Sequence, residues 1–216
     1  MDIEKARFNM VEQQIRPCDI SDKALLDVLL NIKRENFVLP EYKNIAFADV
    51  EIPLPSGVKM LCPRIDAILL QALALNKNDK VLEVGTGSGY VTAMLGKLSE
   101  FVYSVEIDEK NRQFAIRNLT YAGINNVNIV ACNGLLGLES TGPYNKIFIG
   151  GAVTHVPDAL KEQLIVGGIL VAIIGDENVM HAIKITKISD SEYTEAKLNE
   201  TIAEFLQTDS IKQFNF

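Results

Sequence analysis

Three glycines, Gly85, Gly87 and Gly89, stand at alternate positions directly after the apolar run VLEV at residues 81–84. Glycine carries no Cβ, so a turn of this kind lets backbone N–H groups come close to a bound ligand. Turning the chain requires fewer glycines than this, and we therefore expect a binding site instead of a purely structural turn. The residues expected to bind the ligand here are Gly85, Thr86, Gly87, Ser88 and Gly89.

A carboxylate accompanies each of two successive apolar runs. Glu83 lies in the run that leads into the glycines, and Glu106 stands near the end of the next run, in YSVEID. A dinucleotide-binding turn reads G-x-G-x-x-G, whereas this one reads G-x-G-x-G, and Glu83 would repel a pyrophosphate. Glu83 is suited to accept a hydrogen bond from an ammonium group, and Glu106 is suited to bind two ribose hydroxyls.

The third apolar run ends in ACNG, where the amide of Asn133 can pair with the edge of an adenine ring. Ile107 and its apolar neighbours can sandwich that ring. An ammonium group, a ribose and an adenine without phosphate describe S-adenosylmethionine, which we expect as the cofactor. Taken alone, each polar residue is also explained as a solvated side chain, but their order along three runs favours a site. Gly134 and Gly150 complete the expected cofactor-binding set.

The elements that must position these residues alternate regularly after Lys80. Apolar runs that predict strands are followed by amphipathic segments that predict helices, which is typical of a parallel sheet covered on both faces. The sequence therefore predicts an α/β fold with a doubly wound, mostly parallel, Rossmann-like sheet. The expected strands are 81–84, 101–107, 127–132, 146–150 and 169–174, and the expected helices are 90–98, 109–122 and 158–165.

Two amphipathic helices are expected before this core, over residues 2–16 and 21–37, the second with Ser21 as its N-cap. Residues 39–63 are rich in proline and too irregular for one element, so we expect a functional loop or a lid. A further helix is expected over 64–75, with Pro63 as its first residue.

Beyond the core, the run HAIKITKIS at 181–189 alternates with a period of two, as a strand does. The last six residues, IKQFNF at 211–216, can supply a second strand. We therefore expect an antiparallel strand pair at the C-terminal end. The whole chain, 1–216, is read as one domain, made of N-terminal helices and acceptor loop (1–63), cofactor-binding core (64–175) and C-terminal strands (176–216).

The composition narrows the functional classes. The 216 residues are 48% hydrophobic with a net charge of −7, and their lysines are mixed with acids, which argues against nucleic acid as a partner. No apolar run reaches the length of a membrane span, so no membrane partner is expected. Three scattered cysteines without a CxxC pattern suggest neither a metal site nor disulfides, and we expect a cytoplasmic protein that is a monomer or a dimer.

The sequence resembles the protein-L-isoaspartate O-methyltransferase family of class I methyltransferases over residues 7 to 175. The resemblance implies transfer of a methyl group from S-adenosylmethionine to the α-carboxylate of an L-isoaspartyl residue in a damaged protein. The segments that carry it are MVEQQI, IKRENFVLPEYKNIAFADVEIPL, VLEVGTGSGY, YSVEID, GINNVNIVACNG, PYNKIFIGGAV and VPDALKEQLIVGGILVAIIG.

The acceptor segment departs from the family pattern. Where the family has a Thr-Ile-Ser-x-Pro type segment, this chain has Lys59-Met60-Leu61-Cys62-Pro63, so a leucine replaces the serine that lies beside the transferred methyl group. Lys59 and Arg64 flank that position, and their charged groups can either bind a carboxylate or remain solvated. A nucleophilic role for Cys62 is disfavoured, because no histidine lies near it in the sequence. The acceptor-pocket candidates are Asp49, Lys59, Met60, Leu61, Arg64 and His155.

Other functions remain open at this point. A relative with a rebuilt loop could methylate a small molecule or another protein group, and Leu61 favours that reading over strict isoaspartyl repair. A non-catalytic S-adenosylmethionine-binding protein is a second possibility, disfavoured by the intact Glu83, the three glycines and Glu106. A nicotinamide dehydrogenase is disfavoured by the glycine spacing.

Overall fold

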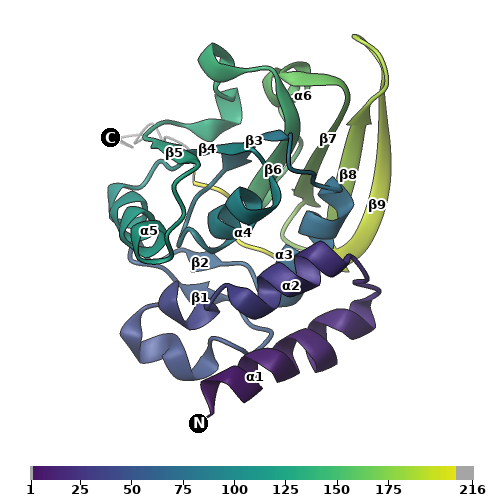
Figure 1. Ribbon diagram of the computed structural model, residues 1–216. Helices are drawn as coiled ribbons and strands as arrows, with labels where there is room; N and C mark the ends of the chain where they lie inside the picture. Colours follow the sequence, from purple (N-terminus) through teal and green to yellow (C-terminus); the bar gives the residue numbers. More distant parts are fainter. Residues whose placement is uncertain (1, 208–216) are drawn as a thin grey trace, which may run out of the picture.

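The computed structural model describes residues 2–207, and within them one seven-stranded sheet organises the molecule in the order β5-β4-β3-β6-β7-β8-β9 (Figure 1). Strands β5, β4, β3, β6 and β7 pair in parallel, whereas β8 and β9 are antiparallel to their neighbours. The strands are β3 (Lys80–Val84), β4 (Phe101–Val105), β5 (Val127–Val130), β6 (Tyr144–Val153), β7 (Leu164–Gly175), β8 (Met180–Lys187) and β9 (Tyr193–Thr201). The expected doubly wound, mostly parallel sheet is confirmed.

The chain reverses its direction of travel across the sheet between β5 and β6. From β3 it moves outward to β4 and β5, and it then returns to place β6 on the other side of β3. The loops after β3 and β6 therefore diverge at this point, which is where open α/β sheets bind ligands.

The sheet is covered on both faces, as the alternation of β3 requires. Val81 packs into a core formed with the N-terminal helices and with α3 (Pro63–Leu73), α4 (Tyr90–Leu98) and α5 (Glu109–Tyr121). Leu82 and Val84 pack into a second core on the opposite face, which includes Leu160 of α6 (Asp158–Glu162). Because successive side chains of a strand point to opposite faces, Glu83 shares the face of Val81.

The N-terminal helices form a layer outside α3 and α4 (Figure 1). Helix α1 (Ile3–Asn9) continues through a π-helical turn over Met10–Ile15 and a short 3-10 turn over Arg16–Cys18, so the expected helix over 2–16 is regular only in its first half. Helix α2 (Lys23–Asn31) ends earlier than predicted. The prediction of Ser21 as its N-cap is wrong, because the Asp22 carboxylate accepts from the Leu25 N–H at 3.1 Å. A carboxylate at that position also interacts favourably with the helix dipole.

The irregular segment before α3 contains little regular structure beyond 3-10 turns over Arg34–Asn36 and Pro40–Ile45 and the small hairpin of β1 (Ile52–Pro53) and β2 (Lys59–Met60). Helix α3 begins at Pro63, as predicted. No helix among residues 2–207 combines the length and the apolar character needed to cross a membrane.

The C-terminal strand pair is confirmed, but its second strand is β9 at Tyr193–Thr201. The segment 211–216, to which we assigned that strand, lies outside the described residues. Residues 202–207 follow β9 and cross back over the carboxyl end of β6, where Phe205 forms a parallel bridge with Ala152. Leu206 N–H donates to the Ala152 carbonyl at 2.9 Å. This return places the C-terminal segment beside the loops that follow β3 and β6.

Candidate functional site

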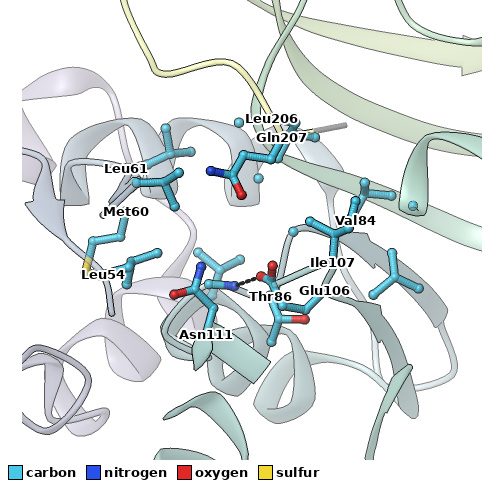
Figure 2. A pocket seen from close by; sticks show the side chains of 18 of the residues that line it. Leu54, Met60, Leu61, Val84, Thr86, Glu106, Ile107, Asn111, Leu206 and Gln207 are labelled. Carbon is cyan, nitrogen blue, oxygen red and sulfur yellow. Dashed lines mark hydrogen bonds between the residues drawn. The ribbon is translucent and has the colours of Figure 1, made fainter. Parts of the chain in front are cut away.

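A pocket opens at the carboxyl ends of β3, β4 and β6, where the sheet order reverses. Figure 2 shows Leu54, Met60 and Leu61 on one side of it and Val84 and Ile107 on the other. Glu106 and Thr86 lie between these two walls, and Gln207 of the C-terminal segment reaches in from above them (Figure 2). The pocket thus unites the glycine turn, the loop before α3 and the C-terminal segment.

The glycine turn forms the floor of the pocket because its backbone takes conformations that other residues avoid. Gly85, Gly87 and Gly89 have φ values of +90°, +55° and +81°. Gly85, Thr86, Gly87 and Ser88 line the pocket. Gly89 does not line it and instead forms the N-cap of α4, so its expected contact with the ligand is not supported by the geometry.

Glu106 lies at the end of β4, where both of its carboxylate oxygens face backbone donors. Oε2 accepts from the Gly87 N–H at 2.8 Å, and Oε1 accepts from the Asp108 N–H at 2.9 Å. Burial raises the pKa of this carboxyl group, and the two N–H groups oppose that rise. Each carboxylate oxygen keeps a second lone pair, so the group can still accept from two ribose hydroxyls in the pocket.

Glu83 does not lie on the pocket wall, which corrects our expectation of direct contact with an ammonium group. Its side chain points to the face of the sheet beneath α4, where Oε2 accepts from the hydroxyls of Thr92 and Ser104, each at 2.6 Å. Ser104 in turn contacts the Thr86 hydroxyl at 2.5 Å. Burial raises the pKa of Glu83 to about 8, so the group is mostly neutral at pH 7. Glu83 therefore supports the glycine turn from below.

The segment after β5 builds the side of the pocket at which we expected adenine. Asn133 lines the pocket, and its Oδ1 accepts from the Leu135 N–H at 3.1 Å, which directs the remaining amide donors elsewhere. Gly134 packs so tightly that a Cβ would lie 2.3 Å from Val105 Cγ2 and 2.6 Å from Val84 Cγ1. A Cβ at Gly150, on β6, would lie 2.8 Å from the Gly85 carbonyl oxygen. Both glycines therefore allow the segments at the strand ends to pack closely against each other, and both line the pocket with Ile107.

The acceptor side is more apolar than the sequence suggested. Met60 and Leu61 line the pocket, as does Lys59, but the Lys59 ammonium is engaged by two acids. Its Nζ lies 3.2 Å from Glu204 Oε1 and 3.8 Å from Glu51 Oε2. Lys59 therefore connects the acceptor loop to the C-terminal segment. Its ammonium group is already paired with acids of the protein, so it is not an unpaired cation available to bind the acceptor carboxylate.

Three further acceptor candidates lie away from the pocket. Arg64 Nε donates to Asp49 Oδ2 at 2.9 Å, and its N–H donates to Asp49 Oδ1 at 3.1 Å, so these two residues satisfy each other. His155 is exposed, and among residues 2–207 its ring forms a hydrogen bond only with the adjacent Thr154 hydroxyl, at 3.1 Å. Burial raises the pKa of Cys62 to about 11, which keeps the thiol protonated and argues against a nucleophile.

The structure also brings in residues that sequence reasoning missed. Asn111 of α5 lines the pocket and exchanges two hydrogen bonds with Ser56 of the acceptor loop. Asp66 of α3 lines the pocket although it is buried. The sequence pattern could have identified it, because a carboxylate on an apolar helix face requires a partner. That apolar face is formed by Ile65, Leu69, Leu70 and Leu73. No local signal in the sequence indicates Glu204, Phe205, Leu206 and Gln207, which join the pocket from the far end of the chain.

Comparison with known proteins agrees with this geometry. Residues 5–206 match the family model described as protein-L-isoaspartate(D-aspartate) O-methyltransferase. A protein-L-isoaspartate O-methyltransferase 2 of Marinobacter nauticus is 35% identical over 200 residues, which are 92% of this chain and 91% of that protein. A protein-L-isoaspartate O-methyltransferase of Dictyoglomus thermophilum is 38% identical over 176 residues, 82% of this chain and 80% of that one.

Two solved structures share the fold. One, titled protein-L-isoaspartate O-methyltransferase, superimposes with a TM-score of 0.82 at 25% identity and covers 95% of this chain and 66% of the matched chain. The other, from Plasmodium falciparum, is described as a putative protein-L-isoaspartate O-methyltransferase in complex with S-adenosyl-L-homocysteine. It has a TM-score of 0.81 at 20% identity and covers 96% of this chain and 99% of that one. With the family model matching nearly the whole chain, the protein belongs to the protein-L-isoaspartate(D-aspartate) O-methyltransferase family.

Proposed function

We propose that this protein is an enzyme that methylates the free α-carboxylate of L-isoaspartyl residues in damaged proteins, with S-adenosylmethionine as the methyl donor. The observation that carries the proposal is the pocket at the reversal point of the sheet, where the glycine turn and Glu106 lie opposite an apolar acceptor wall. Membership of the family supports the choice of reaction.

The residues of the pocket fit S-adenosylmethionine. Glu106 would accept from the ribose hydroxyls and Asn133 would pair with the adenine edge, while Gly134 and Gly150 allow the strand ends that carry these residues to pack closely. S-adenosylmethionine, when bound, supplies an electrophilic methyl group on a sulfonium centre. The apolar side chains of Leu54, Met60 and Leu61 would exclude water from the space beside it.

The chain needs little acid–base chemistry for this reaction. A carboxylate acceptor is already ionised at neutral pH, because its ordinary pKa is about 3.5. The protein therefore contributes mainly by holding the acceptor in line with the methyl group. Such positioning removes a large part of the activation free energy. We also propose that the protein acts in the cytoplasm, a location that its three free cysteines support.

The direct test is methyl transfer from labelled S-adenosylmethionine to a peptide that contains L-isoaspartate, with the matching L-aspartate peptide as control. Calorimetry with S-adenosylhomocysteine measures cofactor binding separately. We expect labelling of the isoaspartyl peptide alone. Cofactor binding without labelling would contradict the proposed acceptor and leave the cofactor assignment standing.

A further inference from the structure

A buried carboxyl group faces the acceptor side of the pocket at Asp66, in the first turn of α3. Its side chain is 2% exposed, and the residue lines the pocket together with Leu61 and Tyr90. Oδ2 accepts from Nη1 of Arg34 at 3.2 Å. Oδ1 is also buried and makes no hydrogen bond with any residue in the range 2–207. A buried carboxyl oxygen without a partner destabilises a protein. Because Asp66 lines the pocket, a group that arrives with the substrate is the nearest candidate for that partner.

Arg34 connects the Asp66 carboxyl group to Leu61, the position at which the family has a serine. The guanidinium is fully buried, and its Nη2 donates to the Leu61 carbonyl at 2.9 Å. Its Cζ lies 4.6 Å from the centre of the Tyr90 ring. One rigid cation therefore holds the Asp66 side chain and the Leu61 backbone beside each other. The Leu61 side chain offers no hydrogen-bond donor.

We propose that Asp66 is the acceptor-binding residue of this chain, and that its protonated carboxyl group donates a hydrogen bond from Oδ1 to the carboxylate that receives the methyl group. The inference rests on the proposed function, since it names the residue that binds the isoaspartyl carboxylate. Oδ2 continues to accept from Arg34 in this arrangement. No proton is transferred, because the donated proton stays on Asp66 while the other oxygen of the acceptor attacks.

The charges around Asp66 favour the donor form near neutral pH. Two carboxyl groups in contact must share a proton, because they repel each other when both are ionised. Burial raises the pKa of Asp66 to about 7, against the lowering effect of Arg34 and with a further rise from Asp49. Glu83 at the end of β3, Cys62 before α3 and Tyr90 of α4 also lie within electrostatic reach of the Asp66 carboxyl group.

Two substitutions separate hydrogen bonding from packing. Asp66→Asn keeps an N–H donor at every pH, whereas Asp66→Val removes the donor and keeps an apolar side chain. For Asp66→Val we expect the KM for isoaspartyl peptide, and the Kd for that peptide in the presence of S-adenosylhomocysteine, to rise about tenfold or more, as when a hydrogen bond to a charged group is lost. Adding Leu61→Ser to Asp66→Val should recover part of that loss, because serine restores a donor.

The dependence of kcat/KM on pH distinguishes a hydrogen-bonding role of Asp66 from a purely structural one, because a structural role would leave this dependence unchanged. In the wild type, kcat/KM for isoaspartyl peptide should fall as the pH rises through about 7, because Asp66 loses the proton that it donates. In Asp66→Asn this fall should disappear. The matched control is Glu35→Gln, which alters another buried arginine–carboxylate pair, Arg7–Glu35 at 2.6 Å, outside the pocket lining. It should keep the wild-type KM and pH profile.

An unchanged peptide KM and Kd in Asp66→Val would overturn the inference, and so would a flat wild-type pH profile between 6 and 8. The wild-type profile keeps the test decisive if the variants do not fold. Each variant is accepted only if it binds S-adenosylhomocysteine with the wild-type affinity. The two proposals fail differently: a wild type that does not label isoaspartyl peptide contradicts the function, whereas one that labels it without dependence on residue 66 contradicts this inference alone.

Discussion

At the scale of the residue, Glu106 is the side chain on which we expect cofactor affinity to depend most. Its carboxylate is held by the N–H groups of Gly87 and Asp108 and lines the pocket, so it is oriented before a ligand binds. Glu106→Ala should weaken S-adenosylmethionine binding by about 1.5–3 kcal/mol, the range for hydrogen bonds to charged groups. Calorimetry measures this change. Glu109→Ala, on the exposed side of α5, is the matched control, and equal affinities for both variants would contradict the assignment.

Glu83 illustrates a different role for a carboxyl group close to the same turn. Burial raises its pKa to about 8 from an ordinary value of 4.5, so the folded protein binds a proton at pH 5–8 that the unfolded chain releases. The free energy of unfolding should therefore fall as the pH rises through this window. Asp66 contributes to the fall in the same direction.

Replacing Glu83 with Gln keeps hydrogen-bonding groups next to Thr92 and Ser104 but removes the titration. We expect Glu83→Gln to lose less stability than the wild type between pH 5 and pH 8, as measured by urea unfolding at a series of pH values. If the free energy of unfolding of the variant varies with pH as steeply as that of the wild type, then the ionisation of Glu83 is not the source of this pH dependence.

At the scale of the element, the close approach of β3, β4 and the segment after β5 depends on Gly134. A methyl group there would meet the branched side chains of Val84 and Val105 at 2.6 Å and 2.3 Å, and both valines stand in the pocket wall. Overpacking of this kind typically costs about 1–3 kcal/mol. Gly134→Ala should therefore lower the free energy of unfolding and weaken cofactor binding together.

Thermal unfolding and calorimetry on the same samples test this coupling. Gly123→Ala is a useful comparison, because no heavy atom lies within 4 Å of an added Cβ there, although its φ of +67° carries its own strain. A loss of stability in Gly134→Ala without any change in cofactor affinity would show that the two valines relax away from the pocket.

At the scale of the whole molecule, the C-terminal segment joins the acceptor loop to the sheet. Glu204 accepts from the Lys59 N–H at 2.9 Å and pairs with its ammonium group, and Leu206 lies against Gly151 and Gly85. The Lys59 and Glu204 side chains are partly exposed, so salt should weaken their attraction. Because the segment lines the pocket, its detachment should speed the exchange of cofactor.

We expect Glu204→Gln to increase the dissociation rate of S-adenosylhomocysteine a few-fold at low salt, as measured by stopped-flow displacement. Raising the salt concentration should speed dissociation in the wild type and have less effect in the variant. Glu200→Gln, on the exposed edge strand β9, serves as the control. Identical salt dependence in the wild type and Glu204→Gln would mean that the segment does not control exchange.

Much of the fold follows from short-range patterns. Continuous apolar runs located the parallel strands, which are buried on both faces, and period-3.6 alternation located α3 to α5, all within a few residues. The glycine turn and Glu106 were found for the same reason: a strand end, a turn and a helix start are local. Strand β9 was missed, because its residues Glu195, Lys197 and Glu200 are those of an exposed sheet edge and carry no apolar alternation.

The sequence by itself determined the class of the sheet, the position of the ligand turn and the family, since each depends on residues that are neighbours along the chain. The tertiary structure alone decided that Glu83 lies beneath the turn, that Lys59 is paired with Glu204, and that Arg34 joins Asp66 to Leu61. These contacts bring together residues 21 to 145 positions apart. Residue type states what a side chain can do, but burial and partners, which only folding supplies, decide whether it remains free to act.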